Sequence, residues 1–406
     1  MGRNTVCSVS FTIDSTRSEE FLMAAENRTK VEISSDSGYR LMDGIVSSVI
    51  VTYGTLSSEV AVTITSESLL MQEKGEERIF QNPEKTYADI LKEYPDVETG
   101  KCTHLNDTVE EIVYQHNMDD FSFLLYLAAK CGEGLFITDD GKVSFGMINS
   151  TKSMTDEEKA HQKSVLEKII TAEKNGREIN IRTMEQLPNG SVLIHEQTPY
   201  TICRVHVQEI FNDVYFRYIG YTNPNFSKTS VKPEKLITKA KITDNKDPEN
   251  LGRVQVEFLE FSDKDTKKTW INYLTPFIGI NAGGQVMLPD VDDEVVICIS
   301  DGVPYAINSL RNEALPENCQ DITRKHLAIK DSVITFDENE ITIKQGNKSS
   351  VIVKPDKIVV ENSKGKLSVE SSSAVLAGGN SKLSLNNGST KLVGSTIDLN
   401  TQGISS

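Results

Sequence analysis

The sequence predicts a mainly β chain in three parts, of which only the first mixes helices with strands. Three observations lead to this fold class. Residues 247–312 alternate apolar and polar residues over short runs, which is the period of strands with one buried face. Residues 5–65 repeat this pattern between turn residues. From about residue 331 onward, short apolar pulses recur at a nearly regular spacing.

The central stretch is expected to form a small closed barrel. Its first strand is Gly252 to Phe258, and a second alternation follows at Val295, Ile297 and Ile299 before the turn Asp301-Gly302. Taken by itself, this pattern indicates a Greek-key barrel, a fold that commonly binds oligonucleotides or oligosaccharides.

The same stretch also resembles the oligomer-binding-fold (OB-fold) domain of contractile-injection spikes. That family comprises the VgrG proteins of type VI secretion, the spikes of extracellular injection systems and phage baseplate spikes. Asp292 and Asn308 depart from it, because the family usually has glycine there. The anchors of the resemblance are Asp247 to Phe258, Trp270-Ile271, Thr275-Pro276, Gly283-Gly284, Met287-Leu288-Pro289, Asp293 to Val296, Asp301 to Pro304 and Ser309 to Asn312.

The resemblance implies three domains. Residues 1–232 would be a hub-like, tube-docking domain with two β-barrel subdomains and short helices. Residues 233–315 would be the OB-fold domain, and residues 316–406 a β-helical needle. The chain would accordingly be mainly β, with an α+β first part, hub-type β-barrels, an OB-fold barrel and a trimeric β-helix or prism at its C-terminal end.

The first part is predicted as strands that a helical region interrupts. Thr86-Tyr87-Ala88-Asp89 is a capping box, which predicts a helix from about Tyr87 to Tyr94. Asp119 or Asp120 would cap a second helix, which Gly132 ends. The expected strands are Val6 to Phe11, Thr29 to Ile33, Gly44 to Val51, Val60 to Ile64, Leu135 to Ile137 and Lys142 to Phe145.

Three strings, Arg78 to Asn82, Asp119 to Leu124 and Leu135 to Ile137, resemble the tube-docking half of VgrG proteins and the phage hub. Residues 150–176 are charged and predict a solvated connecting helix capped by Thr155 and Glu158, or else a binding arm. Residues 177–232 return to strands, which we expect to close the barrels begun earlier in the chain.

The composition limits the partners. The net charge of −16 argues against duplex nucleic acid or an anionic membrane surface, because neither attracts an acidic protein. Six widely spaced cysteines without a C-x-x-C pair indicate free thiols in a reducing cytosol. Neither a secretory signal nor a run of about 20 apolar residues is present, so we expect an apparatus to carry the protein out of the cell.

The tail carries apolar pulses that start between five and ten residues apart, with Gly, Asn, Ser and Lys in the gaps. This spacing is typical of a β-solenoid. Stacking within one chain and a narrow prism of three chains both bury such pulses; the family's spikes are trimeric, which favours the prism. The residues expected on its axis are Ile334, Phe336, Ile341, Ile343, Val351, Val353, Ile358, Val360, Leu367, Val369, Leu383, Leu385, Ile397 and Leu399.

No catalytic, cofactor-binding or metal-binding site is predicted. The six histidines are scattered without an H-x-H or H-E-x-x-H spacing, and the adjacent acid pairs do not fit a glycosidase. The stretches after Asn312 and after Leu399 are too short for an effector domain.

The sequence therefore predicts a non-enzymatic, homotrimeric spike. The resemblance implies an inner-tube protein and baseplate components as partners of the N-terminal part. It also implies a PAAR-type tip protein, with or without effectors, that docks near Leu399 and Ile404. The spike would assemble in the bacterial cytoplasm, leave with the particle on contraction and meet the target membrane only by puncture. A spike with peptidoglycan-cleaving activity and a stand-alone carbohydrate-binding barrel remain the alternatives.

Overall fold

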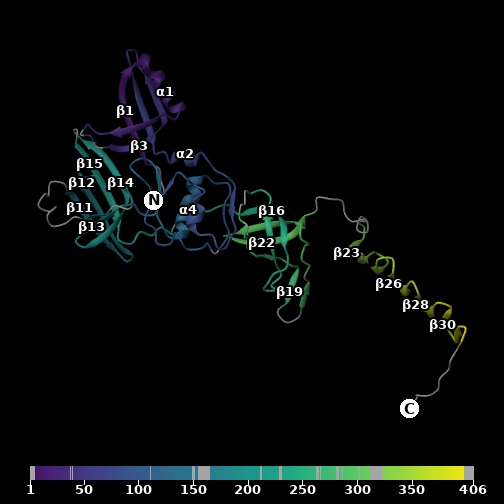
Figure 1. Cartoon of the computed structure of the whole chain (residues 1–406). Coiled ribbons are helices and arrows are strands. Elements are labelled where there is room, and N and C mark those ends of the chain that lie inside the picture. Colours follow the sequence, from purple (N-terminus) through teal and green to yellow (C-terminus); the bar gives the residue numbers. More distant parts are fainter. Residues whose placement is uncertain are drawn as a thin grey trace. The chain divides into compact units, whose positions relative to one another are not determined.

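The chain divides into two compact units in the computed structural model, Met1–Leu310 and Arg311–Ser406 (Figure 1). In the first unit lie two open sheets, a helical region and a closed barrel, whereas the second unit contains one nine-stranded sheet. The structure describes residues 5–36, 38, 40–109, 111–148, 151–153, 165–210, 213–227, 231–261, 265, 267–279, 283–285, 287–300, 302–310 and 323–396.

The N-terminal sheet has the order β1-β4-β3-β2 and contains the four strands expected in residues 5–65. Val60, Val62 and Ile64 alternate along one strand and are buried on the face that a short helix covers. The elements are β1 (Val6–Asp14), a 3-10 turn η1 (Ser15–Arg17), α1 (Ser18–Glu26), β2 (Lys30–Ser34), β3 (Arg40–Tyr53) and β4 (Ser57–Thr65).

The strand pattern does not predict α1. Phe21, Ala24 and Ala25 pack against the sheet with the i, i+3, i+4 spacing of a helix that buries one face. That spacing is the sequence signal, but it spans little more than one turn. Packing on β3 and β4 therefore decides that this short segment is helical.

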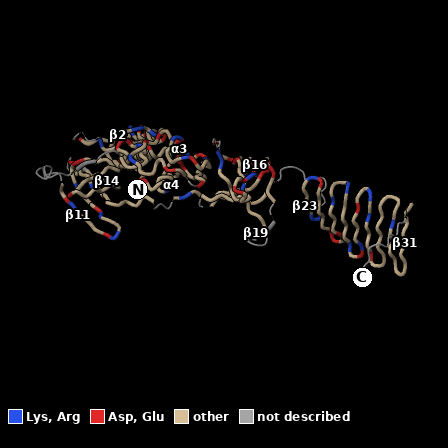
Figure 2. Tube along the Cα trace, turned by 60° about the horizontal axis from the view of Figure 1, so that its bottom comes forward, with Lys and Arg blue, Asp and Glu red and all other residues tan. Residues whose placement is uncertain are grey.

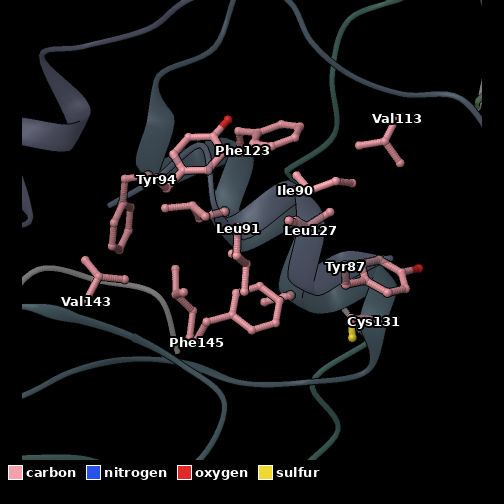
Figure 3. Packing of buried hydrophobic residues seen from close by; sticks show 14 of the residues in the cluster. Tyr87, Ile90, Leu91, Tyr94, Val113, Phe123, Leu127, Cys131, Val143 and Phe145 are labelled. Carbon is pink, nitrogen blue, oxygen red and sulfur yellow. The ribbon is translucent and has the colours of Figure 1, made fainter. Parts of the chain in front are cut away.

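The helical region packs around α4, and buried side chains of both form a hydrophobic cluster rich in aromatic residues (Figure 3). The predicted capping box is present, because the Asp89 amide donates to Thr86 Oγ1 and the Thr86 amide to Asp89 Oδ2. Gly132 has a φ of 77° and ends α4 as predicted. The elements are α2 (Leu69–Gln72), β5 (Arg78–Phe80), α3 (Tyr87–Leu91), β6 (Val97–Thr99), β7 (Val113–Gln115), α4 (Asp120–Cys131), β8 (Leu135–Ile137) and β9 (Val143–Phe145).

A buried polar network ties this region together. The Arg78 guanidinium donates to Asp120 at 2.9 Å and to the Gln115 amide oxygen at 2.8 Å. Tyr94 donates to the same Gln115 oxygen at 2.7 Å and lies under the guanidinium. Arg78 thus joins a strand, a helix and a loop, and its charge is balanced where water is scarce.

Residues 151–153 and 165–221 contain the strands of a second sheet, with the order β10-β13-β14-β15-β12-β11. The expected helix over 150–176 is wrong for residues 151–153 and 165–173, which form the edge strands β10 and β11. Residues 154–164, with Thr155 and Glu158, lie outside the described residues. The expectation that 177–232 closes earlier barrels is also wrong, because these strands pair with one another. The elements are β10 (Thr151–Ser153), β11 (Val165–Glu173), β12 (Gly176–Thr183), β13 (Val192–His195), β14 (Thr198–Ile210) and β15 (Asp213–Tyr221).

The predicted closed barrel is present, with the order β16-β17-β18-β22-β21. Val254 and Val256 on one strand and Val295, Ile297 and Ile299 on another are all completely buried in its centre. The strands are β16 (Leu236–Asp244), β17 (Arg253–Phe258), β18 (Ile271–Tyr273), β21 (Glu294–Ser300) and β22 (Val303–Leu310), and β19 (Phe277–Gly279) pairs with β20 (Gly283–Gln285).

Two loops of the barrel explain the motif Asp247 to Arg253 and the departure at Asp292. The Asp247 carboxylate accepts the Arg253 guanidinium at 2.7 and 3.0 Å, together with the amides of Glu249, Leu251 and Arg253. Asp292 has a φ of 77°, in the left-handed region that glycine adopts freely, and its side chain pairs with Lys241 at 2.7 Å. The turn is therefore kept without the glycine.

The barrel and the helical region share one core across a joint. Ile79, Ile112 and Tyr114 belong to the same hydrophobic cluster as the barrel strands. The Tyr114 hydroxyl donates to the Glu234 carbonyl at 2.9 Å, and Lys85 pairs with Asp265 at 2.8 Å. Because apolar packing and polar contacts cross together, this joint resists separation of the barrel from the helical region.

The tail is one antiparallel meander in which each strand pairs with the next along the chain. The pulses are therefore strands of a single sheet and not coils of a solenoid within one chain. The strands are β23 (Lys325–Ile329), β24 (Ser332–Phe336), β25 (Ile341–Gln345), β26 (Ser349–Lys354), β27 (Lys357–Asn362), β28 (Gly365–Glu370), β29 (Ser373–Gly378), β30 (Ser381–Asn386) and β31 (Ser389–Val393).

Replacing Asp247 by Asn should lower the thermal midpoint of the barrel by several degrees at pH 7, because the amide cannot accept all of these donors. The Arg253 guanidinium and the loop amides hold the pKa of Asp247 well below its ordinary value. Its stabilisation is thus present above the unfolded pKa of about 3.9 and fades as the pH falls toward the folded value. Calorimetry should show the difference between the two proteins narrowing below about pH 4. A difference that does not change with pH would contradict this account.

Replacing Ile112 by Ala should cost about 2–5 kcal/mol and weaken the joint, because the side chain is buried between the helical region and the barrel. We expect calorimetry to resolve two transitions in the variant where the wild-type first unit shows one. Ile50→Ala is the matched control, because Ile50 is 64% exposed on the N-terminal sheet. If both variants unfold like the wild type, the joint does not couple the two parts.

Candidate functional surfaces

The buried titratable side chains of the first unit are structural. Burial raises the pKa of Cys102, Cys131 and Cys203 to about 12, so these thiols are protonated at neutral pH and are poor nucleophiles. Asp119 caps α4 and Asp120 binds Arg78. Across the residues that the structure describes, no three His, Cys, Asp or Glu side chains come together as a metal site requires.

The described part of the chain also has no helix with the length and hydropathy of a membrane span. The tail carries a candidate interaction surface.

The tail sheet has one strongly apolar face. Residues paired directly across an antiparallel sheet point to the same side, so the register defines continuous cross-strand rows. The central row of this face has an aliphatic residue on every strand. It consists of Leu327, Ile334, Ile343, Val351, Val360, Leu367, Leu376, Leu383 and Leu392.

A second row flanks the first on the same face and is also mostly apolar. It consists of Lys325, Phe336, Ile341, Val353, Ile358, Val369, Ala374, Leu385 and Thr390. All twelve of the expected axial residues from Ile334 to Leu385 fall in these two rows. Of the other expected residues, Ile397, Leu399 and Ile404 lie outside the described residues.

The sequence analysis missed Leu327, Leu376 and Leu392 as members of the central row. Leu376 stands in the middle of its pulse, Val375-Leu376-Ala377, whereas the expected axial residues mostly flank a polar one. Its pairing with Leu367 and Leu383 settles the face on which it lies. Counting the residues of each strand from one turn to the next would have placed Leu376 on the apolar face.

None of the described residues of the tail covers this apolar face. Six members of the central row are between 39% and 55% exposed, and a shallow groove of about 600 Å³ runs along the face between β23 and β29. Apolar side chains exposed in such a continuous strip mark an interaction surface.

The opposite face of the tail sheet mixes polar with aliphatic residues, among them Ile352 and the buried Val359, and carries cross-strand ion pairs. Lys357 binds Glu370 at 2.5 Å and Lys366 binds Glu361 at 2.8 Å. Lys357 lowers the pKa of Glu370 and Lys366 that of Glu361, in each case through a hydrogen bond. Charged residues of both signs are spread along the strands and turns of the tail (Figure 2). The ion pairs of this face suit contact with water.

Comparisons with known proteins agree with this architecture. A family model described as the type VI secretion system/phage-baseplate injector OB domain matches residues 238–307. No curated protein matches the sequence significantly.

Among solved structures, an Escherichia coli type VI secretion component, c3393, described as similar to the T4 tail proteins gp27 and gp5, is 14% identical with a TM-score of 0.53. That match covers 76% of this chain and 94% of that one. A chain of the lidded Francisella PdpA-VgrG complex is 12% identical with a TM-score of 0.56, covering 96% of this chain and 74% of that one.

At these identities the structural matches establish the fold, while the family model adds the identity of the barrel. The central barrel therefore belongs to the injector OB-domain family of type VI secretion systems and phage baseplates, and the chain has the fold of the VgrG and baseplate-spike family.

Proposed function

We propose that this chain is the structural subunit of a trimeric spike in a contractile injection machine. The observation that carries the proposal is the uncovered apolar face of the tail, which has an aliphatic residue on each of its nine strands. Three copies that turn this face inward would form a closed prism with the ion-paired face outside. The role is mechanical and not catalytic.

Side-chain packing supports the prism as a stable object. Each half-exposed Leu, Ile or Val that becomes buried contributes on the order of 1 kcal/mol. Every tail strand already has its backbone partners within its own chain, apart from the outer edges of β23 and β31. Copies would therefore associate through side chains, with each chain supplying one complete wall. A face-to-face pair of sheets is the competing arrangement.

Force transmission would use the joint in the first unit. The N-terminal part would dock on the inner tube and baseplate, and the shared core at Ile79, Ile112 and Tyr114 would pass the push of sheath contraction to the barrel. A connection of this kind has to resist load, and packed side chains with low compressibility do so.

The distal end of the tail would receive a tip protein. β31 is the last described strand, and none of the described residues pairs with its outer edge. A cone-shaped PAAR-type protein that docks near Leu399 and Ile404 would cover such an edge, with effectors as further cargo. The spike would assemble in the bacterial cytoplasm and leave it when the sheath contracts.

Ending the chain after residue 312 should abolish tight trimerisation, because the apolar face of the tail is removed. The first unit has its own cores and should remain folded. Light scattering should give a trimer for the full chain and a monomer, or a weak concentration-dependent association, for the shortened one. A full chain that is monomeric or dimeric would refute the trimeric spike. A shortened chain that remains a tight trimer would show that the tail does not drive trimerisation.

Replacing Ile343 by Asp should destabilise the assembly strongly, because three like charges would meet in a dry interior where each costs several kcal/mol. In a lone chain Ile343 is 46% exposed, and an aspartate there would be tolerated. A loss of stability would therefore show that another copy covers Ile343 in the assembly. Val353→Asp should behave in the same way. Asn347→Asp, in the exposed turn between β25 and β26, is the control and should melt like the wild type. Equal melting temperatures for all variants would show that the face does not point inward.

A further inference from the structure

The second sheet of the first unit has one face that is rich in arginine. Strands β11, β12, β15 and β14 lie side by side in this sheet (Figure 1). Along β12 and β15, Ile181, Phe216 and Tyr218 are buried in the core, so the residues between and beside them point to the opposite face. Four residues of that opposite face form what we call the basic patch, namely Arg182, Arg204, His206 and Arg217.

The strand register brings the members of the basic patch together. Arg182 on β12 lies directly opposite Arg217 on β15, and Arg217 lies directly opposite His206 on β14. Arg204 is two residues before His206 on the same strand and therefore on the same face. Like charges directly across from each other destabilise a sheet. An arrangement that costs stability in the free chain indicates that a negatively charged ligand offsets the repulsion.

The chain neutralises little of the basic patch itself, although its net charge is −16. Glu167 binds Arg217 at 2.9 Å, and the arginine side chain remains 46% exposed. Arg204 is exposed, and no described carboxylate forms an ion pair with it or with Arg182. The long strands β1 and β4 of the N-terminal sheet, by contrast, contain no Lys or Arg. The basic patch therefore distinguishes the second sheet from the first.

A hollow of about 300 Å³ opens beside the basic patch. Its lining includes Arg204 and Tyr221 from the sheet and Asn223 and Asn225 from the loop that follows β15. Guanidinium, hydroxyl and amide groups can all donate hydrogen bonds to a carboxylate. The hollow thus offers donors around a space that is large enough for the end of an acidic side chain.

The side chains of the basic patch indicate the class of ligand. Arginine presents a planar fork of donors that binds a carboxylate through two hydrogen bonds. A single-stranded nucleic acid would need aromatic rings on which its bases can stack. The ring beside the basic patch, Tyr215, is already stacked with the Arg182 guanidinium, which lies 4.6 Å from the ring centroid. The face therefore fits carboxylates better than nucleotides.

We propose that the basic patch binds an acidic segment of another protein, whose Asp or Glu side chains pair with Arg182, Arg204 and Arg217. One carboxylate would enter the hollow at Arg204, and others would lie over the Arg182–Arg217 pair and relieve its repulsion. The site lies on one sheet of one chain. It therefore does not require the tail to join three copies, and the inference goes beyond the proposed spike.

The test measures binding to the full-length protein by fluorescence anisotropy at low salt. The probe is a labelled octaglutamate peptide, and octaglutamine and single-stranded oligothymidylate are the comparison ligands. We expect octaglutamate to bind, octaglutamine not to bind, and the affinity for octaglutamate to fall as added salt screens the charges. Arg182→Gln, Arg204→Gln and Arg217→Gln should each lower this affinity about two- to fivefold, the range of an exposed ion pair.

Two matched variants separate the basic patch from the overall charge and from loss of folding. Glu167→Gln removes the carboxylate that competes for Arg217 and should raise the affinity about two- to fivefold, a gain that a destabilised protein does not give. Arg17→Gln removes the same charge as Arg217→Gln from another exposed arginine that pairs with a glutamate, Glu20. Because Arg17 lies in η1, outside the second sheet, this variant should bind like the wild type.

Three results would overturn the inference. Octaglutamate that does not bind, or that binds the three arginine variants as tightly as the wild type, would show that the basic patch is not its site. Oligothymidylate that binds more tightly than octaglutamate would show a nucleic-acid surface instead. Light scattering on the same samples tests the spike separately. A protein that is not a trimer but binds octaglutamate at the basic patch would overturn the proposed function and support this inference.

Discussion

The tail depends on one constraint, which is that a strand of five or six residues buries too little surface to hold a fixed shape alone. Pairing nine such strands in sequence satisfies the hydrogen-bonding groups of their backbone but leaves one aliphatic face exposed to water. A second layer would bury that face, and the described residues of the tail do not supply one. The exposed aliphatic face of the tail is thus the physical basis for the proposed association between copies.

The first unit is built on the opposite principle, because its cores close within one chain. The aromatic cluster around α4 and the interior of the barrel are both buried, and the joint merges the barrel with strands β5 and β7. Arg78 and Asp247 sit at loops and strand ends that apolar packing cannot define, and each is surrounded by partners. Polar groups here select one arrangement of the chain, while apolar burial supplies the stability.

Buried thiols with raised pKa values and acids that cap helices or bind arginine perform structural tasks. At Asp292, a residue in the left-handed conformation whose side chain pairs with Lys241 replaces the glycine that the family usually has. Such substitutions leave the barrel intact because the φ of one residue is a local requirement.

The sequence by itself determined the features that depend on neighbouring residues. The helix caps at Thr86 and Asp119, the barrel strands and the apolar pulses of the tail all appear in the structure. Tertiary structure decided which strands pair: β11 became an edge strand where charge indicated a helix, and both sheets of the first part stayed open. It also placed Leu376 on the apolar face through its register with Leu367. Alternation and capping are local, whereas pairing and register depend on contacts between distant segments, which no short window of sequence contains.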